Sequence, residues 1–210
     1  MYIGMDTKTR RYEMRARRDA TQATREAILA ASLAAVEAER SLSITLGAVA
    51  DRAGVTVKTV LRHFGSREGL LDATWSQVRQ NTLAERTAPP GEPAQALTVL
   101  IKHYENRGDM VLGLLAEEDN DPRARLMCSD GRALHRRWVD EVFGAELPAE
   151  SGAHDRLIDA LVVATDVYCW KLLRRDRGLR IDEVRDRMQF MADAVLAASQ
   201  AAHRPSQGAG

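Results

Sequence analysis

The sequence predicts an all-α protein with an N-terminal three-helix helix-turn-helix domain, a C-terminal helical bundle and about nine helices in total. Apolar residues recur at three- and four-residue spacing along almost the whole chain, which is typical of amphipathic helices. No alternating segment has the length of a useful strand. Hydrophobic residues make up 45% of the 210 residues and charged residues 29%, a composition typical of soluble helical proteins.

Residues 1–20 are expected to form a flexible basic arm before a first helix that runs from about Thr21 or Thr24 to Glu39. Thr24 is expected either to cap this helix or to contact phosphate. The cations of the region are Lys8, Arg10, Arg11, Arg15, Arg17, Arg18 and Arg25. Such a segment either follows nucleic-acid phosphates or is a solvated tail, and its own composition leaves both open.

Three further helices are expected before residue 86. Thr45 is a plausible N-cap for the second, which ends at Gly54, and the third starts at Thr56. Ser66 caps a fourth helix that runs to about Glu85. The second and third helices are short and joined by a glycine-containing turn, which predicts a helix-turn-helix domain over residues 21–65.

A proline-rich linker at residues 88–93 separates this part from a second set of helices. Gly108 is expected to end the first of these helices and so to separate it from the second. The expected helices are 94–106, 109–118, 121–143, 155–176 and 182–201. Residues 66–203 are assigned to this second domain, and residues 204–210 to a disordered tail.

Charge is distributed unevenly along the chain, although the formal net charge is zero. Residues 1–86 contain 14 lysines and arginines against 10 aspartates and glutamates, whereas residues 87–210 contain 16 against 20. The basic half is therefore the candidate surface for nucleic acid.

The third helix carries the donors that a recognition helix needs. In a helix-turn-helix, the second helix of the motif lies in the major groove of DNA. Four polar residues are expected on its outer face: Thr56, Lys58, Thr59 and Arg62. Lysine and arginine can pair with guanine or phosphate, and threonine can contact phosphate or a thymine methyl group. Double-stranded DNA is therefore the expected partner.

Residues 21–75 resemble the DNA-binding domain of the TetR family of transcriptional regulators. The resemblance rests on Thr24-Arg25-Glu26-Ala27-Ile28-Leu29-Ala30-Ala31, on Gly54-Val55 followed by Thr56-x-x-Thr59, and on Phe64-x-Ser66-Arg67-Glu68-x-Leu70-Leu71. It implies that Arg67 grips phosphate at the start of the fourth helix. Thr24 and Thr45 are also expected to belong to the DNA-binding surface.

This sequence departs from the family pattern at three positions. Leu61 and His63 stand where the family usually has tyrosines, and Lys58 stands where it has a small residue. His63 either donates to phosphate in place of a tyrosine hydroxyl or is simply packed. The operator sequence therefore cannot be predicted from the resemblance.

The resemblance also implies a homodimeric repressor that binds a pseudopalindromic operator and is released by a small effector. The charged N-terminus predicts a cytoplasmic protein, and the apolar candidate residues of the pocket favour a hydrophobic or aromatic effector. Two apolar stripes on the last two long helices are expected to serve the core and the subunit contact, with plain intrachain core as the alternative: Leu157, Leu161, Ala164, Tyr168, Leu172, Val184, Met188, Met191, Val195 and Ala198. The candidate ligand-binding residues are Trp75, His103, Tyr104, Arg107, Met110, Trp138, Asp166 and Trp170.

Other classes of protein find less support. No glycine-rich phosphate loop, nucleophile elbow or HExxH motif is found, so neither a catalytic residue nor a cofactor is predicted. The two cysteines lack zinc-ligand spacing, and no metal site is predicted. No apolar run is long enough to span a membrane. An effector-independent DNA-binding protein, a dimeric interaction module and an enzyme remain the alternatives.

Overall fold

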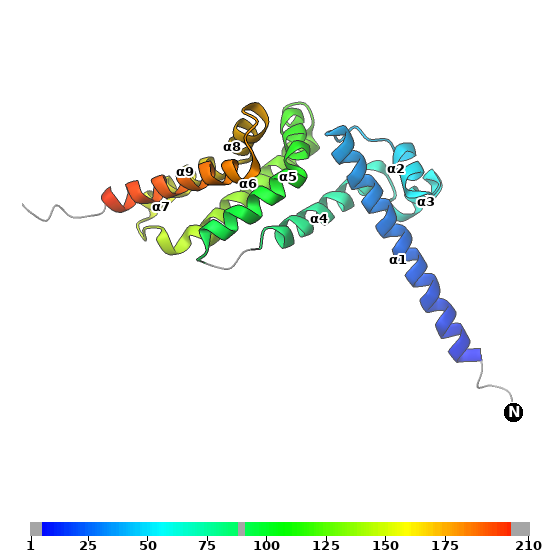
Figure 1. Ribbon diagram of the computed structural model, residues 1–210. Coiled ribbons are helices and arrows are strands. Elements are labelled where there is room, and N and C mark those ends of the chain that lie inside the picture. The colour runs from blue at the N-terminus through cyan, green and yellow to red at the C-terminus, as the bar shows by residue number, and fades with distance from the viewer. Residues whose placement is uncertain (1–5, 88–90, 203–210) are drawn as a thin grey trace, which may run out of the picture. The chain divides into compact units, whose positions relative to one another are not determined.

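The computed structural model describes residues 6–87 and 91–202, and it is helical throughout, with no strand among these residues. The all-α prediction is confirmed (Figure 1). Contacts divide the chain into two compact units, with the boundary between Gln80 and Asn81. The start of the expected arm, part of the linker and the expected tail lie outside the described residues. No described helix is long and apolar enough to cross a membrane.

The first unit consists of α1 (Asp6–Glu39), α2 (Leu46–Ala53), α3 (Val57–Phe64) and most of α4 (Arg67–Glu85). α2 packs against both α1 and α3. The buried apolar residues of the first unit are Ile28, Ala31, Ala35, Val36, Leu42, Ile44, Val49, Ala50, Val60, Leu70, Leu71 and Val78. One polar pair lies among them, in which the Thr74 hydroxyl is 2.8 Å from the Ser32 hydroxyl. A continuous apolar core therefore fixes the short helices against the long one.

The prediction of a flexible arm over residues 1–20 is wrong for the part that the structure describes. α1 begins at Asp6 and not at Thr21 or Thr24, and Figure 1 shows it as one continuous helix. Alanine, arginine, methionine and glutamate favour helix, and neither glycine nor proline interrupts the segment from Asp6 to Glu39. Residues 11–23 are exposed, so this part of the helix is basic and solvated.

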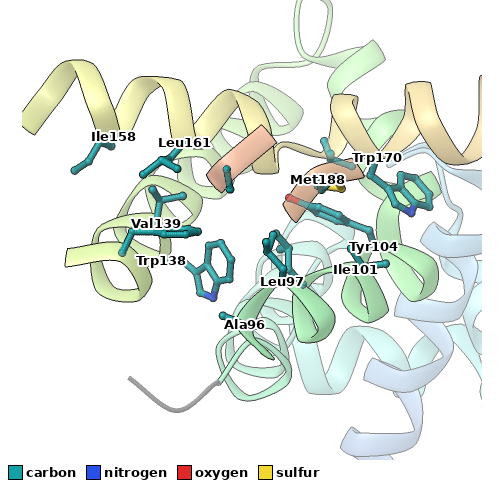
Figure 2. Packing of buried hydrophobic residues seen from close by; sticks show 14 of the residues in the cluster. Ala96, Leu97, Ile101, Tyr104, Trp138, Val139, Ile158, Leu161, Trp170 and Met188 are labelled. Atoms are coloured by element: carbon teal, nitrogen blue, oxygen red, sulfur yellow. The ribbon is translucent and has the colours of Figure 1, made fainter. Parts of the chain in front are cut away.

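The second unit begins with the last residues of α4 and continues through five α-helices and two shorter turns. These elements are α5 (Pro93–Glu117), α6 (Pro122–Phe143), the 3₁₀ turn η1 (Gly144–Glu146), α7 (Ser151–Thr165), α8 (Val167–Lys171), the π-helical turn η2 (Leu172–Asp176) and α9 (Ile181–Ala202). α5 packs against α6, α8 and α9, and α7 packs against α6 and α9. Figure 2 shows side chains of these helices meeting in one apolar cluster that includes Leu97, Tyr104, Trp138, Leu161 and Trp170.

The expected helix break at Gly108 is wrong, because α5 runs through this residue without interruption. A Cβ atom built on Gly108 would lie 2.5 Å from Cζ3 of Trp170. Trp170 is fully buried in the core. The glycine therefore allows α5 and α8 to approach closely around the indole ring, and it does not end a helix.

The single helix expected over residues 155–176 is also wrong. α7 ends at Thr165, and Asp166 adopts an extended conformation with ψ 156° before α8 begins. The Asp166 carboxylate accepts a hydrogen bond from the Tyr168 backbone N–H at 2.8 Å and so caps α8. Aspartate competes with helix continuation in this way because its short side chain bonds to the backbone.

The loop between α1 and α2 is held by a residue that lies far from it in the sequence. Nε of Arg67 donates to the Ile44 carbonyl at 2.8 Å, and Nη2 of the same guanidinium donates to the Leu42 carbonyl. Both carbonyls belong to residues whose side chains are buried in the first unit. Arg67 thus connects the start of α4 to the segment that leads into α2.

Replacement of Gly108 by alanine is expected to lower the free energy of unfolding by about 1 to 3 kcal/mol, because the added methyl group meets the Trp170 ring. Gly131 is a matched control, since it also lies inside a helix and an added Cβ meets nothing within 4 Å. Gly131→Ala is expected to raise stability by about 0.5 to 1 kcal/mol. Urea unfolding measures both, and equal stabilisation by the two changes would contradict the close approach.

Replacement of Arg67 by lysine retains the positive charge but removes the planar group that reaches both carbonyls. The free energy of unfolding is expected to fall by about 1 to 3 kcal/mol, because buried acceptors lose charge-assisted hydrogen bonds. Arg79→Lys, on the exposed side of the same helix, is the control and is expected to be nearly neutral. Equal stabilities of the two variants in urea would show that Arg67 does not hold the loop.

Candidate functional site

The turn between α2 and α3 is fixed by side-chain and backbone caps. Thr45 caps α2 by accepting from the Ala48 N–H at 3.1 Å, as predicted. Gly54 ends the helix in the left-handed region with φ 65°, which a residue with a side chain rarely adopts. Thr56 caps α3 by accepting from the Thr59 N–H at 3.2 Å, and the two hydroxyl groups lie 3.0 Å apart. These caps set the direction in which α3 leaves the turn.

α3 presents a mixed basic and apolar face to solvent. Lys58 and Arg62 are exposed, whereas Val60 is fully buried beneath them. Val57 and Leu61 are each 39% exposed on the same short helix, and the sequence analysis did not include either in the recognition surface. Apolar side chains on a recognition helix can contact thymine methyl groups, so these two residues extend the candidate surface. The sequence does indicate that these two residues share a face, because they lie four positions, or about one helical turn, apart.

Neither His63 nor Thr24 has the role that was first expected of it. The Nε2 atom of His63 is buried without a hydrogen-bond partner, and its ring packs 6.2 Å from that of Phe64, which favours the packed alternative. Thr24 lies inside α1, where its hydroxyl donates to the Ala20 carbonyl at 2.8 Å, so it does not cap the helix. Arg25, which was expected in the basic arm, instead lies 4.5 Å from the centre of the Phe64 ring. It thereby links α1 to the end of α3.

The proposed phosphate contact of Arg67 competes with its structural role. Its Nε and Nη2 groups are directed at the Ile44 and Leu42 carbonyls, and Nη1 lies 3.8 Å from the Glu68 carboxylate. The side chain is 36% exposed. A phosphate contact therefore has to use the remaining exposed part of the guanidinium group.

Two of the predicted ligand-binding residues in the second unit, His103 and Arg107, bind the same carboxylate. Nδ1 of His103 lies 2.8 Å from Oε2 of Glu85, and Nη2 of Arg107 donates to Oε1 at 3.0 Å. Burial raises the pKa of Glu85, but the hydrogen bonds from Arg107 and His103 outweigh it and lower this pKa overall. The triad of Glu85, His103 and Arg107 thus joins the end of α4 to α5.

The other predicted ligand residues of this unit mostly have packing or capping roles. The hydroxyl of Tyr104 donates to the Thr165 carbonyl at 3.0 Å, and Nε1 of Trp138 donates to the Arg86 carbonyl at 3.3 Å. Nε1 of Trp170 donates to Glu105 at 2.9 Å. Met110 is buried, and Asp166 caps α8. Trp75 belongs to the first unit, where its Nε1 atom is buried without a partner.

Two buried polar residues that sequence reasoning missed lie beside these side chains. Arg86 is 9% exposed and His135 is 5% exposed, and each has a ring or guanidinium nitrogen with no partner in the structure: Nε in Arg86 and Nδ1 in His135. The guanidinium carbon of Arg86 lies 5.5 Å from the centre of the Tyr104 ring. His135 stacks on Trp138 with ring centres 5.7 Å apart.

Only one of these two residues left a signal in the sequence. His135 falls on the apolar stripe of α6, seven residues after Cys128 and three before Trp138. Arg86 directly follows α4, where an arginine is ordinarily taken as solvated. Its burial depends on α5 and α6, which local spacing does not reveal.

Burial keeps both interior histidines neutral at pH 7. Burial, together with the positive charge of Arg86, lowers the pKa of His103 to about 4 and that of His135 to about 3. Burial also raises the pKa of Asp166 and that of Tyr104 above their ordinary values. The interior therefore holds the guanidinium of Arg86 beside two neutral histidine rings.

An open groove of about 670 Å³ lies between α5 and α9. Its lining residues are Ala94, Gln95, Thr98, Arg185, Asp186, Gln189, Phe190 and Asp193. None of the predicted ligand-binding residues lines it. The predicted effector site therefore does not coincide with this groove.

Stability is expected to fall as the pH decreases from 7 to 5. An unfolded chain protonates its histidines near pH 6.5, whereas His103 and His135 stay neutral in the folded chain until about pH 4 and 3. The unfolded state therefore binds more protons in this window. The free energy of unfolding, measured in urea at each pH, should lose about 2 kcal/mol through His135 by pH 5. His135→Phe should reduce the pH dependence by that amount, and an unchanged dependence would show that His135 is not buried and neutral.

Comparison with known proteins agrees with this architecture. Residues 28–74 match the family model of the bacterial regulatory proteins of the tetR family. No curated protein matches the chain. A solved structure of a TetR-family transcriptional regulator from Rhodococcus sp. is 19% identical, with a TM-score of 0.62 over 82% of this chain and 98% of that chain. A transcriptional regulator from Rhodococcus sp. Rha1 is 15% identical, with a TM-score of 0.61 over 83% and 96%.

At these identities the two solved structures support the fold, while the family model covers the segment that contains α2, the glycine turn and α3. The matched segment ends inside α4, beyond Arg67. Residues 28–74 thus form a helix-turn-helix DNA-binding domain similar to that of the bacterial regulatory proteins of the tetR family.

Proposed function

We propose that the chain is a cytoplasmic repressor that binds a pseudopalindromic operator as a homodimer and is released by a small effector. The observation that carries the DNA-binding part is the outer face of α3. Lys58 and Arg62 are exposed there, and neither makes an ion pair within the described residues. Folding alone gives no reason to place two cations on this face, whereas contact with bases or phosphates does.

Exposed apolar side chains on α7, α8 and α9 support the proposed homodimer. Val163 and Phe190 are each 70% exposed, and Tyr168 and Leu172 are more than half exposed. Several residues of the predicted stripes are instead buried within the chain: Leu157, Leu161, Ala164, Val184 and Met188. The stripes thus divide between an intrachain face and an outer face, and a second copy would cover the outer one.

The proposed response to an effector uses the continuity of α4. This helix starts at Arg67, beside the helix-turn-helix, and ends at Glu85, which binds His103 and Arg107. An effector that binds better to a state with the last turn of α4 displaced would shift the population toward that state. DNA affinity would then fall. A ligand that binds this unit and leaves DNA affinity unchanged would contradict the mechanism.

An effector-independent DNA-binding protein is the second candidate. The dense apolar cluster around Trp138 and Trp170 favours it, because a packed interior needs no ligand for stability. The unpartnered nitrogens of Arg86 and His135 favour the effector-responsive alternative. The proposal assigns no catalytic activity to the chain.

The DNA-binding proposal is tested with duplexes enriched from a random-sequence pool by the full chain. Fluorescence anisotropy at two salt concentrations should show saturable binding that weakens with salt. Lys58→Ala, Arg62→Ala should reduce the affinity by at least about tenfold and make the salt dependence shallower by about two ion equivalents. Two chains should bind each palindromic duplex.

A matched double variant, Lys102→Ala, Arg137→Ala, removes the same charge from exposed positions of α5 and α6. It is expected to bind DNA within about twofold of wild type, because neither residue belongs to the helix-turn-helix. If enrichment yields no preferred duplex, or if the two double variants lose affinity equally, the recognition role of α3 is wrong. One chain per palindromic duplex would contradict the homodimer.

A further inference from the structure

Arg86 is a cation inside the second unit without a carboxylate partner. The adjacent carboxylate, Glu85, does not pair with Arg86, because His103 and Arg107 bind it. Among the described residues, no carboxylate lies within ion-pairing distance of the Arg86 guanidinium, which interacts with the Tyr104 hydroxyl, and its Nε–H has no acceptor. Asp166 carries the nearby charge that acts on Arg86 over a longer distance, but its carboxylate caps α8. A buried cation of this kind is costly until an anion neutralises it.

His135 supplies an acceptor to the same region. The Thr165 hydroxyl has a single proton, which it donates to the Leu161 carbonyl at 2.7 Å. Its oxygen lies 3.1 Å from Nε2 of His135, so this nitrogen carries the ring proton and donates to Thr165. Nδ1 of the neutral ring is then a lone-pair acceptor, buried and without a donor. The two unsatisfied groups are thus one donor on a cation and one neutral acceptor.

Several side chains connect Arg86 to His135 in the same interior. The Arg86 backbone carbonyl accepts from Nε1 of Trp138, and Trp138 stacks on His135. The Tyr104 ring lies against the Arg86 guanidinium. Figure 2 shows Trp138 and Tyr104 within the same apolar cluster. A ligand bound here would therefore meet aromatic rings beside its polar contacts.

We propose that the effector is a small hydroxy acid with an aromatic or apolar body, whose carboxylate pairs with Arg86 and whose hydroxyl group donates to His135. The carboxylate accepts from the Nε–H, and the hydroxyl satisfies Nδ1, so one molecule completes both groups. This inference rests on the proposed function, because it names the class of effector for the proposed repressor. Both nitrogens are buried in the structure, so binding of the acid requires the side chains packed around them to move.

The first test is thermal unfolding of the full chain with salicylate, mandelate and phenyllactate. Each acid is compared with its neutral amide and with the acid that lacks the hydroxyl group: benzoate, phenylacetate and phenylpropionate. At least one hydroxy acid is expected to raise the unfolding midpoint by about 5 °C at saturating concentration, and its two counterparts by less. The proposal is overturned if no hydroxy acid stabilises the chain more than its amide does. Equal stabilisation by a hydroxy acid and its deoxy counterpart overturns the role of His135.

The second test compares two arginine variants. Arg86→Met replaces an unpaired buried cation by an apolar side chain of similar length, so the ligand-free chain is expected to unfold about 3 °C higher and to lose the response to the acid. Arg174 is the control, because it pairs with Glu105 at 3.0 Å and donates to the Leu179 carbonyl. Arg174→Met should unfold at a lower temperature than wild type and still respond. A lower midpoint for ligand-free Arg86→Met overturns the proposal.

DNA binding separates failure of this inference from failure of the proposed function. If the chain binds its enriched duplex but no hydroxy acid stabilises it, the effector class is wrong and the regulator remains. If the chain binds no duplex, the proposed function fails, and the unfolding measurements still decide whether Arg86 and His135 hold an acid. A stabilising acid should also weaken duplex binding at least about tenfold, and no effect on DNA affinity would overturn its role as effector.

Discussion

The packing of α5 against the end of α4 depends on the carboxylate of Glu85, which binds both His103 and Arg107. It lies at the last residue of a helix whose first residue, Arg67, holds the Leu42 and Ile44 carbonyls. Each end of this helix therefore has a polar contact within its own unit. A helix transmits a displacement along its axis when both ends are held by specific contacts, and a contact with two discrete arrangements turns this displacement into a switch. The neighbouring Arg86, which has no carboxylate partner among the described residues, is where we propose that the effector binds.

The DNA-binding surface depends on a different constraint, the exact geometry of a very short segment. α2 and α3 are too short to be stable alone, so their caps and the packing of α2 against α1 and α3 determine whether they form. Thr45 and Thr56 each satisfy a backbone donor at a helix start, and Gly54 reverses the chain between them. Because these elements fix the axis of α3, Lys58 and Arg62 leave the protein in a defined direction. Specific readout of bases needs that rigidity, whereas phosphate attraction alone does not.

Local sequence patterns predicted the helix-turn-helix in detail because its determinants are local. Caps, a left-handed glycine and outward-facing cations can each be identified within a few residues, and Thr45, Gly54 and Thr56 occur where they were expected. The start of α1 was misjudged for the opposite reason, since its first turns have helix propensity but no buried face. Gly108 was misread as a helix break because its packing partner, Trp170, is distant in the sequence. The burial of Arg86 and the contact between Arg25 and Phe64 are likewise tertiary effects.

An unpaired arginine in a packed interior is a stability cost that folding alone gives no reason to retain. Arg174 shows what the same unit does with an arginine that serves the fold, since it pairs with Glu105 and donates to a backbone carbonyl. Arg86 departs from that pattern, and its Nε–H and the Nδ1 atom of His135 are left unsatisfied together. A ligand that bonds to both groups would gain the free energy of two buried hydrogen bonds, whereas a neutral or deoxygenated analogue would leave one buried group unpaired. The same feature that weakens the free chain would therefore give the regulator its selectivity, because only the matching acid relieves the cost.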